Sequence, residues 1–460
     1  MQQRYIKYEE NNRRLILFFC GWSSDYHLIE SLEFPVGYDI LALWDYSNPE
    51  FSFPSKNYDE SVVLAWSFGV AEASCFIRSY CLRLNITGRY AINGSPFPIE
   101  EERGISPEIF KNTIENLDAK NLLKFRIRIC GGKNNYYQFS SKLQNEEDIE
   151  TLRHQLRVFG DKFISSQKEE VRNIWDHAFI SERDAIFQKE RLIKAWEGTP
   201  FTLMKGGHHF IDFQYIINLT IKNKNKIRHN FLKNAPTYNS GAIVQKEISQ
   251  ELFRLWKEHQ QNTKSVLEIG CGTGFLTELI VKGFHPERLL MIDLYGSIEE
   301  KEGKSMMIGD SEVLMPKLSD ETFNSIASSS TVQWFHSPVK FLTECKRILT
   351  KNGVLAFSVF TSGTCKEINE ITGNGLLYLS GDQWERSALN QGFGVLGRKD
   401  SEYKITFTDN LEMLRHLKHT GVSSLNGQNK FSSTIKKILT SPREQCQLSY
   451  ISTSLVLEKL

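Results

Sequence analysis

Short runs of apolar residues, each ending in a turn, alternate along the chain with segments whose apolar positions follow a helical period. The first group of runs reads LILFFCGW, DILALWDY, VVLAWS, RYAING, HAFIS and FTLMKGG, and the second reads SVLEIG, LLMIDL, FNSIASSS, GVLAFSVF, YKITF and SYISTSLVLEKL. Such runs are typical of strands in a mainly parallel sheet that helices cover on both faces. The pattern therefore predicts an α/β fold built in two successive blocks.

A polar, basic segment without apolar period, NLTIKNKNKIRHN, separates the two blocks. We predict a first domain over residues 1–217, a linker over 218–228 and a second domain over 229–460. Residues 106–176 are helix-like and charged, and they interrupt the strands of the first block. This interruption predicts a helical cap inserted into the first sheet.

The composition of the chain limits which molecules it can bind and where in the cell it can lie. The 460 residues include 56 basic and 55 acidic side chains, so no net field favours nucleic acid or an anionic membrane. No apolar stretch approaches the roughly 18 residues that a membrane-spanning helix needs. The eight cysteines are scattered without metal-ligand spacing, which suits a reducing compartment. We expect a cytoplasmic protein without a metal, and neither nucleic acid nor membrane as its partner.

A possible nucleophile lies in the stretch AWSFGV, where an apolar strand stops at Ser67 and a helix follows. A strand, a serine between small residues and a helix form a nucleophile elbow, in which the hydroxyl projects above the sheet. Gly69 supplies one small neighbour, whereas Ala65 stands where a glycine is usual. Serine is also a common helix N-cap, so the interpretation depends on partners elsewhere in the chain.

Partners follow in a suitable order. Asp184 comes just after a late strand, and His208 comes just after the next strand, in MKGGHHF. The chain order Ser, Asp, His is that of α/β-hydrolases, in which the acid orients the imidazole and the imidazole takes the serine proton. We predict a catalytic triad of Ser67, Asp184 and His208.

Alternatives remain open for two of the three positions. His209 adjoins His208, and Glu100 or Glu101 could reach the imidazole from the turn after an earlier strand. The turn after the first strand and the residue after the nucleophile usually lend backbone N–H groups to an oxyanion hole, so Trp22 and Phe68 are the candidate donors.

The stretches FFCGW, AWSFGV, AINGSPFPI, ISERDAIF and GGHHF together resemble the pimeloyl-carrier-protein methyl ester esterases of biotin synthesis. The resemblance covers about residues 12–217. It implies a compact α/β-hydrolase that removes a terminal methyl ester from a seven-carbon acyl chain held by acyl carrier protein.

The second block opens with a glycine-rich turn, VLEIGCGTGF, between a predicted strand and a predicted helix. Glycines in such a turn let the backbone approach a ligand closely. A dinucleotide site is one alternative, although its usual spacing is G-x-G-x-x-G. The E-x-G-x-G-x-G spacing resembles motif I of class I, Rossmann-like, S-adenosylmethionine-dependent methyltransferases, which implies a cofactor site at Glu268, Gly270, Gly272 and Gly274.

Two carboxylates extend the cofactor prediction. Asp293 ends the next strand, where a carboxylate can accept both ribose hydroxyls. Asp310 follows a third strand and is placed for the adenine amine. These positions favour S-adenosylmethionine as the cofactor.

Residues that flank the glycine-rich turn narrow the choice of molecule that accepts the methyl group. The stretches NFLKNAPTYNSGAIVQ, SSSTVQWF and LEMLRHLKHTGV resemble the malonyl-carrier-protein methyltransferases of biotin synthesis over residues 228–460. The resemblance implies that Tyr238 and Gln245 close over the cofactor and that Gln333 and Trp334 face the transferred methyl group.

Together the two resemblances predict a bifunctional enzyme of biotin synthesis. Its partner is acyl carrier protein, loaded with malonyl or with pimeloyl methyl ester. Basic residues of the cap could meet this acidic protein: Lys120, Lys124, Arg126 and Arg128. Two alternatives stay open, namely an esterase of other acyl esters fused to a small-carboxylic-acid methyltransferase, and an inactive hydrolase-like docking module on a methyltransferase.

Overall fold

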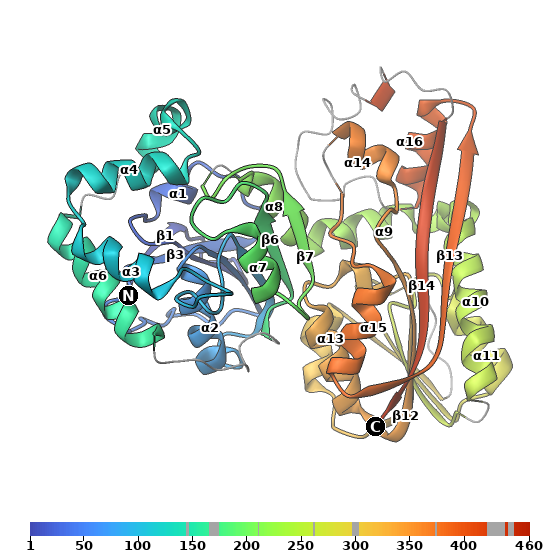
Figure 1. Cartoon of the computed structure of the whole chain (residues 1–460). Helices are drawn as coiled ribbons and strands as arrows, with labels where there is room; N and C mark the ends of the chain where they lie inside the picture. The colour runs from blue at the N-terminus through green and yellow to red at the C-terminus, as the bar shows by residue number, and fades with distance from the viewer. Residues whose placement is uncertain are drawn as a thin grey trace. The chain divides into compact units, whose positions relative to one another are not determined.

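The structure is a computed structural model, and its chain divides into two compact units, Met1–Ile217 and Asn218–Leu460. The structure describes residues 1–143, 147–164, 174–209, 211–260, 263–296, 303–372, 375–420, 438–439 and 446–460. Figure 1 shows both units, each with its own sheet. Among the described residues, no helix is both long enough and apolar enough to cross a membrane.

The first unit contains a seven-stranded sheet in the order β1-β3-β2-β4-β5-β6-β7. Six strands run parallel, and β1 pairs antiparallel with β3 at one edge. Every residue of β4 and β5 is buried, as expected for central strands covered on both faces. The bounds are β1 Gln2–Lys7, β2 Arg14–Phe19, β3 Tyr38–Trp44, β4 Glu60–Trp66, β5 Ile86–Ile92, β6 His177–Ser181 and β7 Phe201–Met204.

Helices cover this sheet, and one group of them is inserted between β5 and β6. The covering helices are α1 His27–Glu30, α2 Gly69–Tyr80, α7 Lys189–Ala195 and α8 Phe213–Thr220. The inserted group consists of α3 Pro107–Glu115, α4 Ala119–Ile129, α5 Lys133–Phe139, the 3-10 helix η1 Ser140–Leu143 and α6 Ile149–Phe163. It falls within the segment 106–176 predicted as a cap, of which 144–146 and 165–173 lie outside the described residues.

The second unit is built on a sheet in the order β10-β9-β8-β11-β12-β14-β13. Its first five strands are parallel, and β14 runs antiparallel to both β12 and β13. The bounds are β8 Ser265–Ile269, β9 Arg288–Asp293, β10 Lys304–Ile308, β11 Phe323–Ser329, β12 Leu349–Phe360, β13 Phe393–Phe407 and β14 Cys446–Lys459. The predicted α/β class is confirmed for both blocks.

The helices of the second unit alternate along the chain with its strands. They are α9 Lys224–Gly241, α10 Ile243–His259, α11 Phe275–Phe284, α12 Ser311–Leu314, α13 Pro338–Ile348, α14 Lys366–Thr372, α15 Gly381–Asn390 and α16 Asn410–His419, with 3-10 turns η3 Met315–Lys317 and η4 Val332–Trp334.

The segment predicted as a linker, 218–228, is largely helical. It contains the end of α8 and the start of α9, and only residues 221–223 lie between the two helices. Lys222 and Lys224 are buried rather than solvated. Both ammonium groups find partners in the second unit: that of Lys222 donates to the carbonyls of Gln333 and Phe335, and that of Lys224 contacts Glu312 and Asp310.

Candidate active sites

The first candidate site forms where β4 turns sharply into α2. Ser67 adopts a left-handed conformation with φ of 58°, which is strained for a residue that carries a Cβ. Small neighbours allow this turn, because a Cβ at Gly69 would lie 2.4 Å from the Phe19 carbonyl oxygen and one at Gly94 would lie 2.3 Å from the Ser67 carbonyl oxygen. Ala65 lies within β4 and does not have a positive φ, so its position does not require glycine. The local geometry is that of a nucleophile elbow.

The structure brings Ser67, Asp184 and His208 together at the ends of three strands. The Nε2 atom of His208 lies 2.8 Å from Oγ of Ser67, and its Nδ1 atom lies 2.8 Å from Oδ2 of Asp184. The other oxygen of Asp184 accepts the backbone N–H groups of Ile186 and Phe187 at 2.8 and 2.9 Å, which fixes the carboxylate. This chain of hydrogen bonds can pass the Ser67 proton to His208 while Asp184 holds the ring.

The alternative acids and histidine lie elsewhere. Glu100 forms an ion pair with Arg103 at 3.1 Å, and Glu101 reaches Arg191 at 3.4 Å. The ring of His209 packs among aromatic side chains, including Trp66 at a centroid distance of 5.5 Å. The structure therefore groups Asp184 and His208 with Ser67, and not their alternatives.

The two predicted oxyanion-hole residues lie at the cavity that contains the nucleophile. Trp22 and Phe68 both line the cavity above Ser67. Within the described parts of the chain, no group accepts a hydrogen bond from the backbone N–H of either residue. The indole of Trp22 donates instead to the Leu152 carbonyl of α6 at 3.0 Å, which ties this turn to the cap. Both N–H groups are thus available to an oxyanion.

The cavity above Ser67 has a volume of about 270 Å³ and lies between the cap and the sheet. Its buried floor includes Ser67, Phe68 and His208, whereas the lining residues Arg128 and Gln188 are exposed and mark its mouth. Apolar side chains of α3, α4 and α6 make up much of the wall: Phe110, Phe125, Ile129 and Leu156, with Ile109 at the exposed rim. The site therefore suits an ester at the end of an apolar chain.

The second candidate site lies at the carboxyl ends of β8, β9 and β11, around the glycine-rich turn. Gly270, Gly272 and Gly274 all have positive φ, of 72°, 53° and 97°. A Cβ built at Gly272 would meet nothing within 4 Å, whereas one at Gly270 would collide with Thr331. The turn therefore leaves open space at Gly272, where the backbone can approach a ligand.

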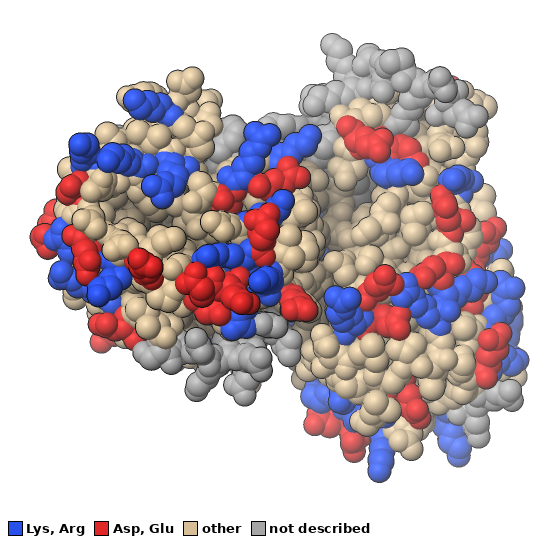
Figure 2. Space-filling model, in the orientation of Figure 1, with Lys and Arg blue, Asp and Glu red and all other residues tan. Residues whose placement is uncertain are grey.

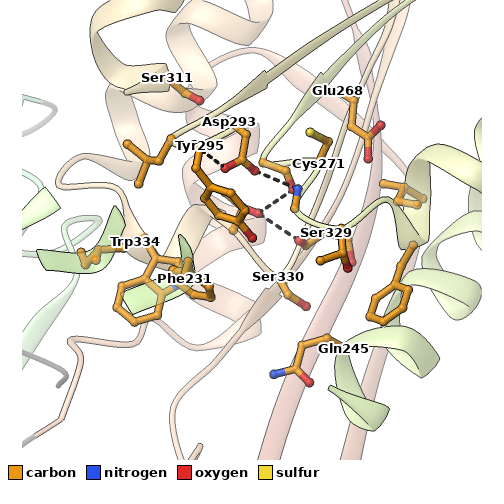
Figure 3. A pocket seen from close by; sticks show the side chains of 18 of the residues that line it. Phe231, Gln245, Glu268, Cys271, Asp293, Tyr295, Ser311, Ser329, Ser330 and Trp334 are labelled. Carbon is orange, nitrogen blue, oxygen red and sulfur yellow. Dashed lines mark hydrogen bonds between the residues drawn. The ribbon is translucent and has the colours of Figure 1, made fainter. Parts of the chain in front are cut away.

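Two buried carboxyl groups line this pocket (Figure 3). Oδ2 of Asp293 accepts the Gly272 N–H at 2.8 Å, and burial raises the pKa of Asp293 to about 6. Glu268 accepts the Thr277 hydroxyl at 2.7 Å, and burial raises its pKa to about 8. Burial thus favours the protonated form of both carboxyl groups, and it does so more strongly for Glu268 than for Asp293.

An ionic cluster that the sequence did not suggest lies beside Asp310. The ammonium of Lys224 lies 2.8 Å from Glu312 and 3.4 Å from Asp310. Glu312 also accepts the backbone N–H groups of His336 and Ser337. Burial would raise the pKa of Glu312, but Lys224 and His336 lower it well below its ordinary value. The cluster joins the start of α9 to the loop that follows η4.

Aromatic side chains form the rest of the pocket. Phe231, Tyr238 and Trp334 line it together with Gln245, and the ring of Phe231 meets that of Trp334 edge to face at 5.7 Å (Figure 3). Gln333 was expected to face the transferred methyl group, but its side chain makes a different contact. Its amide donates to the Ser330 carbonyl at 2.6 Å, and it is not among the described residues that line the pocket.

Comparison with known proteins assigns a family to each unit. The profile of the family "Pimeloyl-ACP methyl esterase BioG" matches residues 1–216, and that of "Methyltransferase domain" matches residues 267–357. A protein of Bacteroides fragilis (strain 638R) named malonyl-[acyl-carrier protein] O-methyltransferase is 31% identical over 97% of this chain and 93% of its own length. The chain belongs to this malonyl-[acyl-carrier protein] O-methyltransferase family.

Two further matches cover one unit each. A protein of the same name from Bacteroides thetaiotaomicron is 35% identical over 215 residues, which are 45% of this chain and 80% of that protein. A crystal structure of BioG from Haemophilus influenzae is 27% identical and covers 45% of this chain and 94% of that chain, with a TM-score of 0.42. This family member is therefore an enzyme with a pimeloyl-ACP methyl esterase domain and a methyltransferase domain, which confirms the two resemblances predicted from the sequence.

Proposed function

We propose that the chain catalyses two steps of biotin synthesis. Its second unit methylates the free carboxylate of malonyl-acyl carrier protein with S-adenosylmethionine, and its first unit hydrolyses the methyl ester of pimeloyl-acyl carrier protein. The observation that carries the proposal is the presence of two distinct sites in one chain: a hydrogen-bonded Ser67–His208–Asp184 triad below an apolar cavity, and a glycine turn bonded to Asp293. The printed name of the full-length relative supports the malonyl substrate.

Ester hydrolysis follows from the contacts of the triad. Oγ of Ser67 attacks the ester carbonyl while Nε2 of His208 takes its proton, and the N–H groups of Trp22 and Phe68 stabilise the oxyanion. His208 returns the proton to the methoxy group, which leaves as methanol. Water then attacks the acyl-serine and loses a proton to His208. The bond between the acyl group and Oγ of Ser67 breaks, His208 returns the proton to Oγ, and the free acid is released. The formed triad supports an active hydrolase over an inactive docking module.

The second pocket fits S-adenosylmethionine, because it combines open space at Gly272 with the buried acceptor Asp293. When bound, this cofactor supplies an electrophilic methyl group. Asp293 would accept the ribose hydroxyls, and Asp310 lies in the same pocket for the adenine. Phe231, Tyr238 and Trp334 exclude water from the transfer site. A carboxylate is an adequate nucleophile, so the chain needs to supply alignment rather than a strong base.

The cap offers a surface for the carrier protein. Lys120, Lys124 and Arg128 are exposed and recur at four-residue intervals, which places them on one face of α4. Figure 2 shows basic side chains gathered over this helix, and Arg128 also lines the cavity mouth. Arg126 does not belong to this row, because its guanidinium turns inward to the Ser23 hydroxyl at 3.1 Å. The row fits an acidic carrier whose acyl arm enters the cavity.

A panel of acyl thioesters tests the methyl-transfer half. With labelled S-adenosylmethionine, malonyl-carrier protein should become labelled, whereas acetyl-carrier protein should not because it lacks a free carboxylate. Transfer to a small free acid, with malonyl-carrier protein left unlabelled, would contradict the assignment and favour a small-acid methyltransferase.

A further inference from the structure

The proposed function creates a conflict within one chain, because the esterase unit could hydrolyse the malonyl methyl ester that the other unit makes. We propose that the cavity above Ser67 selects its substrates by acyl length and spares the malonyl ester, and that Phe125 of α4 is a specificity-determining residue. This inference rests on the proposed function. It concerns which ester the triad accepts, not whether the triad is active.

The cavity sets a fixed path between solvent and nucleophile. Arg128 and Gln188 are exposed at its mouth, while Ser67 and His208 are buried at its floor. The guanidinium of Arg191, which also lines the cavity, is already bound to the Gly104 carbonyl at 3.1 Å. An acyl chain that reaches Ser67 must therefore place its methylenes along walls that are mostly apolar.

Burial of methylenes favours the longer substrate. A pimeloyl chain has four more methylenes than a malonyl chain, and burying one methylene strengthens binding about fourfold. If all four enter the cavity, transition-state binding favours the pimeloyl ester by about 200-fold.

The shorter substrate also meets a penalty. For a malonyl ester to reach Ser67, the thioester and the adjoining amide of the pantetheine arm must enter the cavity in place of methylenes. A buried amide loses its hydrogen bonds to water, and a largely apolar wall does not replace them. Attraction to the long chain and exclusion of the short one thus act in the same direction.

Phe125 is placed to control this selection. It lines the cavity and packs edge to face against the Trp22 indole, with ring centroids 5.0 Å apart. A serine at this position would make the wall polar and wider without touching the triad. Leu123 provides a matched control, since it lies on the same helix, is 45% exposed and is not among the described lining residues.

The test uses methyl esters of malonyl- and pimeloyl-pantetheine as substrates, which removes docking of the carrier protein from the comparison. The unmodified chain should hydrolyse the pimeloyl ester with a kcat/KM about 200-fold higher than that for the malonyl ester. Phe125→Ser should reduce this ratio at least fivefold, mainly through the pimeloyl ester, whereas Phe125→Leu and Leu123→Ser should leave it within about twofold.

The possible outcomes of this assay separate length selection from the esterase assignment. A ratio near one in the unmodified chain overturns length selection while leaving the esterase assignment intact. A high ratio that is unchanged in Phe125→Ser overturns the role of Phe125 as the specificity-determining residue. No hydrolysis of the pimeloyl ester would instead contradict the proposed function. If Phe125→Ser does not fold, judged by its melting curve, Ile109→Ser replaces it. Ile109 lines the same cavity from α3 and is 55% exposed, so the substitution should be tolerated and should lower the ratio in the same way.

Discussion

At the scale of single residues, both sites depend on side chains whose orientation is fixed by their neighbours. Asp184 is held by two backbone N–H groups, and Asp293 is held by the N–H of Gly272. Such support keeps a charged group in one position before a substrate arrives, so little reorganisation is needed during the reaction. Substitutions at these residues should therefore change one activity and leave the other intact.

Ser67→Ala should reduce ester hydrolysis by several orders of magnitude, because the attacking oxygen is lost while the rest of the triad remains. Methyl transfer to malonyl-carrier protein should be unchanged. Both rates can be followed on one preparation, together with labelling by a fluorophosphonate, which should mark the unmodified chain but not the variant. Substantial esterase activity in Ser67→Ala would mean that another nucleophile is used.

Asp293→Asn should weaken S-adenosylmethionine binding at least tenfold, because charge-assisted hydrogen bonds to the ribose are lost. Since burial raises the pKa of Asp293 to about 6, the carboxyl group is protonated below that pH and ionised above it. Affinity in the unmodified chain should rise between about pH 5 and about pH 7 and then level off, as calorimetry can measure. Equal pH dependence in the Asn variant would assign the titration to another group.

The triad residues also show how much of this site could be predicted from the sequence. Ser67, Asp184 and His208 could be grouped because each follows a strand and the ends of parallel strands converge at one edge. Glu100 follows a strand as well, and the sequence could not separate it from Asp184. Only the side-chain contacts do so, since Arg103 binds Glu100.

At the scale of elements, periodicity identified most strands but missed two features. β1 went unrecognised because it is a mostly half-exposed edge strand, where a polar sequence is tolerated. The start of α9 was interpreted as a linker because its lysines follow no apolar period. The partners of Lys224 lie far along the chain, at Glu312 and Asp310, and no local pattern could reveal them.

The contacts at the start of α9 lead to a test. Lys224→Met should destabilise the second unit by about 3 kcal/mol, because it removes the lysine ammonium that is paired with the buried carboxylate of Glu312. Lys233→Met is the control, since Lys233 is exposed on the same helix. Thermal or urea unfolding measures both effects. Equal stability of the two variants would show that the ion pair contributes little.

At the scale of the whole molecule, the two units have separate sheets and separate sites, and each pocket is lined by residues of one unit only. If the chain is split after Thr220, at the end of α8, both parts should fold and each should keep its own activity. Circular dichroism and the two activity assays would check this. Loss of cooperative unfolding in either part would mean that the units share stabilising contacts across this boundary.

The central claim is that one chain both adds and removes the methyl group that masks a carrier-bound carboxylate. The most direct measurement follows labelled methyl in two parallel reactions of the purified full-length protein. We predict transfer of label from S-adenosylmethionine to malonyl-carrier protein, and release of labelled methanol from pimeloyl-carrier protein methyl ester. An unlabelled malonyl-carrier protein, or a pimeloyl ester that stays intact, would contradict the account for the corresponding unit.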